Sequence, residues 1–207
     1  MNEKFYSLKK EKQDIMINGA MQIFALNGYR HASTDDMVKA SGVSKGLWFH
    51  YFDTKAGLYS FVASYGLKYA MLEYRMCNIE RGEDYFDVRL KLENLKMRVS
   101  EKYPYLPLFI ISVLKEEDPD ALPEISELKD LYREQVDEML ARADYRVIRQ
   151  YDDHLCLMDM LDAVSDELLE KAYRDGTFTK EIHMKNYKRY SDALRAALMK
   201  GAVLQTL

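Results

Sequence analysis

Apolar residues recur along most of the chain at intervals of three and four positions. This spacing places apolar side chains on one face of an α-helix. Three such stripes are Val88, Leu92, Leu95 and Val99; Leu157, Leu161, Val164 and Leu168; and Tyr187, Tyr190, Leu194 and Ala197. The sequence shows no convincing run in which apolar and polar residues alternate between hairpin turns, as they do in half-buried strands. The pattern therefore predicts an all-α fold.

Glycines and capping residues divide this pattern into about nine helices. Gly28 is placed to end the first helix. Ser33 or Thr34, and then Ser44, are placed to cap two short helices that the turn at residues 41–43 separates. Longer helices are expected in the rest of the chain. The expected ranges are 9–27, 33–40, 44–51, 55–79, 84–101, 104–116, 121–143, 151–175 and 179–200.

Composition narrows the class of protein. The 207 residues are 48% apolar and 31% charged, which argues against disordered, collagen-like and membrane-embedded chains. The longest mainly apolar run, residues 106–114, is less than half of the roughly 20 residues that a membrane helix needs. The two cysteines, Cys77 and Cys156, stand far apart and form neither a disulfide framework nor a zinc motif. We therefore expect a cytoplasmic protein that does not contact membranes.

The net charge of −4 hides an asymmetry along the chain. Residues 1–60 carry eight Lys and Arg against six Asp and Glu, whereas residues 61–207 carry 22 against 28. This favours a small basic module followed by a larger acidic one. We predict two domains, residues 1–54 and residues 55–207, which the helix beginning at Lys55 joins rigidly.

The two short helices and their glycine-containing turn form a helix-turn-helix, whose second helix fits the DNA major groove. That helix, residues 44–51, has the sequence Ser-Lys-Gly-Leu-Trp-Phe-His-Tyr. Lys45 can reach a phosphate or a guanine, and Leu47 can pack on a thymine methyl group. Gly46 would let base edges approach the backbone closely. This mixture of side chains predicts a helix that reads DNA.

Phosphate groups can be bound by residues next to these base contacts. His50 and Tyr51 carry ring groups that can hydrogen-bond to the DNA backbone. Thr34 and Lys55 lie at the starts of two further helices, where free N–H groups and the helix dipole favour an anion. Lys55 would add a full positive charge. These four residues are therefore predicted to hold the helix-turn-helix on the duplex.

Three segments in this order resemble the N-terminal part of the tetracycline-repressor (TetR) family. They are Phe24-Ala-Leu-Asn-Gly-Tyr29, Ser33-Thr-Asp-Asp-Met-Val-Lys-Ala-Ser-Gly-Val-Ser-Lys-Gly46, and His50-Tyr-Phe-Asp-Thr-Lys55 with Leu58. The resemblance implies three DNA-binding helices followed by a six-helix domain for ligand binding and dimerisation. It also implies a homodimer built from the last two long helices, about residues 151–200. The chain beyond these segments resembles the family in helix number and layout only.

The resemblance also implies which residues touch DNA. They are Thr34, Ser44, Lys45, Gly46, Leu47, Phe49, His50, Tyr51 and Lys55. Leu47 stands where a small or hydroxyl-bearing residue is common, and Phe49 stands where tyrosine is common, so the preferred operator is expected to differ. Trp48 replaces a smaller aliphatic residue inside the three-helix core, and we expect it to be buried.

In function, the resemblance implies a transcriptional repressor that binds double-stranded DNA at a palindromic operator and releases it when a small-molecule effector binds. We place the effector pocket at Tyr69, Met97, Tyr105 and Phe109, because their helices converge in the family architecture. Core packing is the alternative role for each of these four residues. A helical ligand-binding protein without DNA-binding activity is the alternative function, which the departures at positions 47 and 49 keep open.

A helical enzyme that uses the acidic segment 152–166 is a second alternative. His154 lies among acidic residues there, but Leu157 and Met158 occupy the positions one helical turn further on, where a second metal ligand would be needed. Common catalytic motifs and phosphate-binding glycine motifs do not occur in the sequence. We therefore expect no enzyme activity, no metal site and no cofactor.

Overall fold

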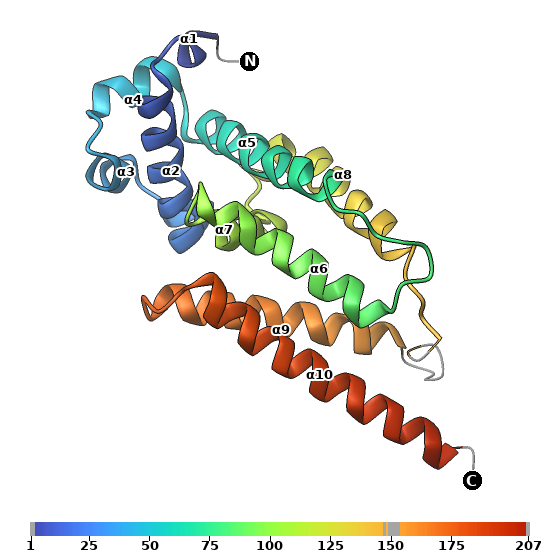
Figure 1. The fold of residues 1–207 in the computed structure, drawn as a ribbon. Coiled ribbons are helices and arrows are strands. Elements are labelled where there is room, and N and C mark those ends of the chain that lie inside the picture. Colours follow the sequence, from blue (N-terminus) through green and yellow to red (C-terminus); the bar gives the residue numbers. More distant parts are fainter. Residues whose placement is uncertain (1–2, 147, 149–153, 206–207) are drawn as a thin grey trace. The chain divides into compact units, whose positions relative to one another are not determined.

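The computed structural model describes residues 3–146, 148 and 154–205, and these residues are mostly helical (Figure 1). Within them, strand pairing is limited to one bridge between Asp84 and Asp144. The all-α prediction is therefore confirmed. The α-helices are α1 (Glu3–Tyr6), α2 (Lys10–His31), α3 (Thr34–Ser41), α4 (Lys45–Tyr51), α5 (Lys55–Arg75), α6 (Tyr85–Arg98), α7 (Leu106–Lys115), α8 (Leu122–Leu140), α9 (His154–Arg174) and α10 (Lys180–Gln205), and a 3₁₀ turn covers Val99–Glu101.

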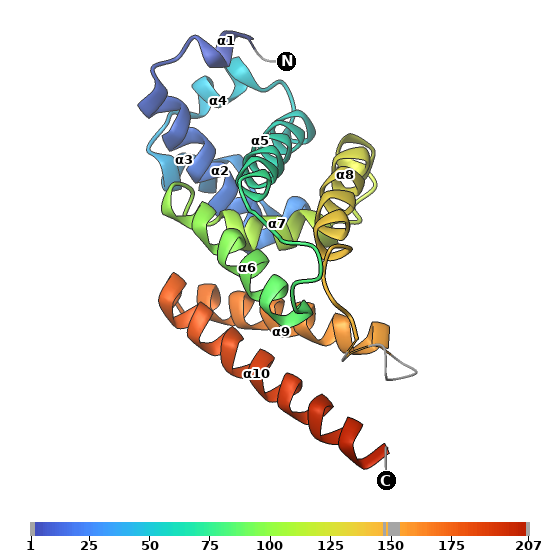
Figure 2. The same ribbon diagram turned by 45° about the vertical axis from the view of Figure 1, so that its right-hand side comes forward.

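Contacts divide the chain into two compact units, residues 1–72 with 99–133, and residues 73–98 with 134–207. We call them unit 1 and unit 2. Unit 1 holds α1 to α4, most of α5 and α7, whereas unit 2 holds α6, α9 and α10. Both views show α2 beside α7 in unit 1 and α9 beside α10 in unit 2 (Figures 1 and 2). The predicted functional boundary between residues 54 and 55 stays a prediction.

Unit 1 is built around α2, which packs against α7 and α3. Its core contains an aromatic cluster in which the ring of Phe24 lies 4.8 Å from Tyr59 and 6.3 Å from Phe109. Gly19 lets α2 and α3 meet closely, because a Cβ atom at this position would lie only 2.8 Å from the Cβ of Ser41. The absence of a side chain at Gly19 therefore allows α2 and α3 to pack tightly against each other.

Helix α1 is a single turn that the apolar pattern did not predict. Its Phe5 is fully buried, and the ring packs against Tyr51, Phe52 and Phe61 at centroid distances of 5.8, 5.4 and 5.0 Å. One aromatic side chain thus anchors the N-terminal segment beside the end of α4.

Unit 2 packs α10 against α9 and α6. Two predicted members of the α10 stripe are wrong, because Tyr190 is 43% exposed and Ala197 is exposed. The buried face of α10 instead includes polar residues, and His183 among them has a partner inside unit 2. The buried positions are His183, Tyr187, Ser191 and Leu198 on α10, and Leu161, Ser165 and Leu169 on α9.

Candidate nucleic-acid interface

The helix-turn-helix consists of α3, α4 and the turn between them. Ser33 caps α3, since its hydroxyl accepts the backbone N–H of Asp36 at 3.1 Å. Gly42 ends α3 in the left-handed region, with φ at 67°, a conformation that costs little only for glycine. Val43, the last residue of the turn, is buried. The predicted cap at Ser33 and the predicted turn are therefore confirmed, and they fix the angle at which α4 starts.

Helix α4 has one buried face and one exposed face. Trp48 is only 2% exposed and packs against the ring of Phe52, which confirms its predicted burial. The predicted DNA-contact residues occupy the rest of the helix surface. Ser44, Lys45, Gly46, Phe49 and His50 are exposed, and Leu47 and Tyr51 are half-buried. Ser44 precedes the helix as predicted, but its side chain makes no capping hydrogen bond.

An ion pair links α4 to α3. The Nζ of Lys45 lies 2.8 Å from Oδ1 of Asp35, and both side chains are more than half exposed. A surface pair of this kind contributes about 1 kcal/mol at most. Lys45 can therefore exchange this carboxylate for another anion at little cost.

Lys55 makes contacts that the sequence did not indicate. Its Nζ donates to the carbonyl oxygens of Arg30 and Ala32 at 3.1 and 3.5 Å, and it lies 4.5 Å from the centre of the Tyr29 ring. Thr54 caps α5, because its Oγ1 accepts the N–H of Gly57 at 3.0 Å. Lys55, at the start of α5, thus donates hydrogen bonds to the C-terminal end of α2.

The four residues predicted to line an effector pocket fall in both units. Phe109 is buried in the aromatic core of unit 1, and Met97 is fully buried in unit 2. Tyr69 is half-buried and packs edge-on against Tyr103. The hydroxyl of Tyr105 accepts a hydrogen bond from Gln22 at 3.2 Å. Their shared role as a pocket stays a prediction.

Unit 2 contains a groove that sequence reasoning missed. It has a volume of about 520 Å³ and lies between α6 and α10. Three lysines border it, and its surface is mainly apolar. The lining residues are Asp87, Leu90, Lys91, Asn94, Met184, Lys185 and Lys188.

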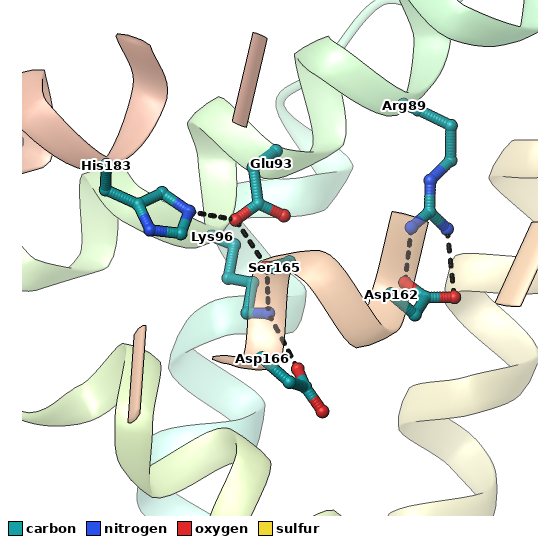
Figure 3. Close-up of polar contacts among 7 residues, drawn as sticks. All are labelled: Arg89, Glu93, Lys96, Asp162, Ser165, Asp166 and His183. Atoms are coloured by element: carbon teal, nitrogen blue, oxygen red, sulfur yellow. Dashed lines mark hydrogen bonds and ion pairs between the residues drawn. The ribbon is translucent and has the colours of Figure 1, made fainter. Parts of the chain in front are cut away.

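A buried polar network in unit 2 was also missed (Figure 3). Arg89 is 6% exposed and forms a two-pronged pair with Asp162. Oε1 of Glu93 accepts the Ser165 hydroxyl at 2.7 Å and lies 2.5 Å from Nε2 of His183. The Lys96 ammonium donates to the Ser165 hydroxyl at 3.0 Å.

The electrostatics of Glu93 follow from these contacts. Burial raises the pKa of Glu93, but the opposing effects of Lys96, His183 and Ser165 prevail and lower it to about 2. The carboxylate therefore stays charged inside unit 2. Ser165 and His183 bond to the same carboxylate oxygen, which is not the arrangement of a nucleophile activated by a neighbouring base.

Metal binding and membrane insertion both bear on the predicted function class. The described residues contain no group of three or more His, Cys, Asp and Glu side chains arranged for a metal ion; Asp152 and Asp153 of the acidic segment lie outside the described residues. Among the described helices, none combines the length and apolar character that a membrane span requires.

Comparison with known proteins links this geometry to a family. Residues 16–60 match the sequence model of bacterial regulatory proteins, tetR family. A search of curated proteins finds no match. Similar solved structures include a TetR family transcriptional regulator from Chloroflexus aurantiacus, with a TM-score of 0.61, 17% identity, and coverage of 94% of this chain and 96% of that one.

The fatty acid degradation regulator FadR from Bacillus halodurans also has this fold, with a TM-score of 0.59 and 18% identity over 88% of this chain and 97% of that one. A third structure, described as a fatty acid metabolism regulator from Clostridium perfringens, has a TM-score of 0.56 and 16% identity, and the match covers 88% of this chain and 97% of that one. The matched segment contains the helix-turn-helix described above. Residues 16–60 thus resemble the tetR family of bacterial regulatory proteins, and the chain shares its all-helical fold with these solved structures.

Proposed function

We propose that this protein is a homodimeric transcriptional repressor that binds an operator in double-stranded DNA and releases it when a small-molecule effector binds. The exposed face of α4 is the single observation that carries this proposal. It presents a cation, a glycine and aromatic rings on a two-turn helix, while Trp48 is buried on the opposite face. This composition suits contact with phosphates and base edges in a major groove.

Within this proposal the residues divide the work by position. Lys45, Gly46 and Leu47 meet base edges, because the N-terminal part of a recognition helix enters the groove. Ser44, Phe49, His50 and Tyr51 line the backbone on either side, and Thr34 adds a contact from the start of α3. Phe49 offers no hydroxyl for a phosphate. Its exposed ring, 51% accessible, instead contributes an apolar contact.

Titration with DNA tests the proposal directly. A duplex is first selected from a random pool by the full-length protein, and its binding is then followed by fluorescence anisotropy at several salt concentrations. The expected affinity falls by about 0.9 log units per log unit of salt for each phosphate contact. Failure to enrich any duplex, or binding that ignores salt, would favour the ligand-binding protein that does not recognise DNA.

The proposed dimer uses exposed apolar residues of α9 and α10. Ile182 and Tyr190 on α10 are 51% and 43% exposed, and Met160 on α9 is 46% exposed. A twofold dimer would place two α4 helices about one DNA turn, roughly 34 Å, apart or at a multiple of that distance. Leu161 is buried inside the protomer, so its substitution tests folding instead of dimerisation.

Light scattering tests this interface with an Ile182→Asp, Tyr190→Asp double variant. We expect a folded monomer, because two charges would enter an apolar contact. Met76→Asp is the control, since Met76 is 81% exposed and lies outside α9 and α10. A double variant that remains dimeric would rule out this face.

The effector part of the proposal is that ligand binding in the domain beyond residue 54 disfavours the DNA-binding shape. Coupling of this kind typically amounts to about 1 to 3 kcal/mol. Tyr69, Met97, Tyr105 and Phe109 remain our proposed pocket, and the groove between α6 and α10 is a second place to look. Substitution of a pocket residue should change the effector concentration that releases DNA without changing affinity for DNA alone.

A further inference from the structure

The inference begins at a break in α2. Gly28 has φ of 65° and ψ of 178°, so the helix is interrupted there although helical turns continue to His31. A break leaves backbone N–H and C=O groups without their usual partners inside the helix. The side chains that satisfy these groups decide where the chain goes next, and α3 of the helix-turn-helix starts only a few residues further on at Thr34.

The C-terminal end of α7 and its cap residue supply two of the partners. The hydroxyl of Ser112 donates to the carbonyl oxygen of Phe24 at 3.3 Å, and Oε2 of Glu116 accepts the N–H of Tyr29 at 3.0 Å. Ser112 belongs to the last turn of α7, and Glu116 is the residue that caps its C-terminal end. They bond to the two sides of the break at Gly28.

Both carboxylate oxygens of Glu116 are in use. Oε1 accepts the N–H groups of Glu117 and Asp118 at 3.2 and 3.0 Å, while Oε2 bonds to Tyr29. An amide in place of the carboxylate has one acceptor oxygen only and cannot serve both sides. Glu116 thus ties the turn after α7 to the segment that leads into α3.

Helix α5 holds the same segment through its carbonyl groups. Lys55 donates to Arg30 and Ala32, and its ammonium group lies near the face of the Tyr29 ring. Residues 29–32 are therefore held from two directions. The residue that caps α7 accepts one of their N–H groups, and Lys55 of α5 donates to two of their carbonyl oxygens. All of these groups belong to unit 1.

We infer that Glu116 and Lys55 form a clamp on residues 29–32 that sets the position of the helix-turn-helix for DNA binding. The inference rests on the proposed function, and it makes Glu116 a positioning residue that touches no DNA. It also gives Lys55 a role other than the phosphate contact predicted from the sequence. Displacement of α7 or α5 relative to α2 would pass through these bonds to α3.

Glu116→Ala in the full-length protein tests the clamp against simple electrostatics. Removal of a negative charge should by itself strengthen binding to a polyanion, whereas loss of the clamp should weaken it. We expect about tenfold weaker binding to the selected duplex, the loss typical of one charged hydrogen bond, with an unchanged salt slope. Glu117→Ala is the matched control, because Glu117 is exposed and adjacent, and it should bind within about twofold of the parent.

Glu116→Gln and Lys55→Ala complete the test. Glu116→Gln should fall between the parent and Glu116→Ala, and it replaces the alanine variant if circular dichroism shows that variant to be unfolded. For Lys55→Ala, an unchanged salt slope supports the clamp. A slope reduced by about 0.9 means a lost phosphate contact and overturns the role given to Lys55. Glu116→Ala binding as tightly as Glu117→Ala overturns the role of Glu116.

Failure of the clamp and failure of the proposed function give different results. If the parent protein binds no duplex, the proposed function fails, and the clamp is then judged by hydrogen exchange of the Tyr29 amide in DNA-free protein. That exchange should be at least about tenfold faster in Glu116→Ala than in Glu117→Ala, since the amide loses its acceptor. Equal exchange in the two variants overturns the clamp.

Discussion

Helices α4 and α6 both carry several polar side chains, but α4 exposes them to solvent and α6 buries them inside unit 2. α4 turns Lys45 and His50 to solvent and buries Trp48, whereas α6 buries Arg89 and Glu93. The buried pair finds its partners on α9 and α10. Polar groups that are satisfied inside the protein support folding, while polar groups left on a shaped surface serve a molecule outside it. Substitutions in α6 should thus alter stability, and substitutions in α4 should alter DNA binding.

The largest expected effect is the loss of stability in Glu93→Ala. Removal of this buried carboxylate takes away the acceptor of the Ser165 hydroxyl and the partner of His183, and breaking a buried pair typically costs about 3 to 5 kcal/mol. Urea unfolding followed by circular dichroism measures the change. Glu167→Ala on α9 is the control, because Glu167 is exposed, and equal stability of the two variants would contradict the comparison.

Acid should weaken unit 2 through the same residue. The pKa of Glu93 is lowered from 4.5 to about 2, so its stabilisation is complete above pH 4.5 and is lost as the pH falls toward 2. The shift corresponds to roughly 3 kcal/mol. Glu93→Gln should flatten this part of the stability profile, whereas Glu167→Gln should not. Parallel acid profiles for the parent and Glu93→Gln would remove the basis of the prediction.

The sequence predicted the helix-turn-helix better than the interior of unit 2, and the reason is physical. Glycine turns and serine caps act over a few residues, so the cap at Ser33 and the turn at Gly42 follow from local pattern, while the burial of Trp48 was implied by the family resemblance. Burial of Glu93 and His183 depends on partners 90 positions apart along the chain. No local pattern distinguishes such a pair from two solvated side chains.

The predicted site shows the same limit. The exposed face of α4 follows from its short amphipathic sequence, but the contacts of Lys55 with Arg30 and Ala32 depend on how α5 meets the end of α2. The predicted phosphate contact of Lys55 rests on its position at a helix start, its charge and the family resemblance, none of which includes these contacts. Contacts between distant segments decide the role of a side chain, and only the fold reveals them.

Lys45→Ala should produce the larger of two expected effects on DNA binding. Loss of a base or phosphate contact typically costs about 1 to 3 kcal/mol of binding free energy. Stability should change little, because the pair of Lys45 with Asp35 is exposed. Lys39→Ala is the control, since Lys39 is an exposed lysine paired with Asp36 on α3. If both variants lose affinity equally across all duplexes, Lys45 acts through general charge and does not read bases.

Gly46→Ala should have the smallest effect and separates binding from stability most cleanly. A Cβ at Gly46 meets no atom of the protein within 4 Å, and alanine favours the helix by about 0.5 to 1 kcal/mol over glycine. The free protein should therefore become slightly more stable. If α4 lies in the groove with its backbone close to base edges, the added methyl group should weaken binding about fivefold, or roughly 1 kcal/mol, through overpacking. Urea unfolding and anisotropy titration on the same preparation measure both changes. Tighter binding together with higher stability would mean that this part of α4 stays away from the duplex, because the methyl group can clash only with DNA that lies against it.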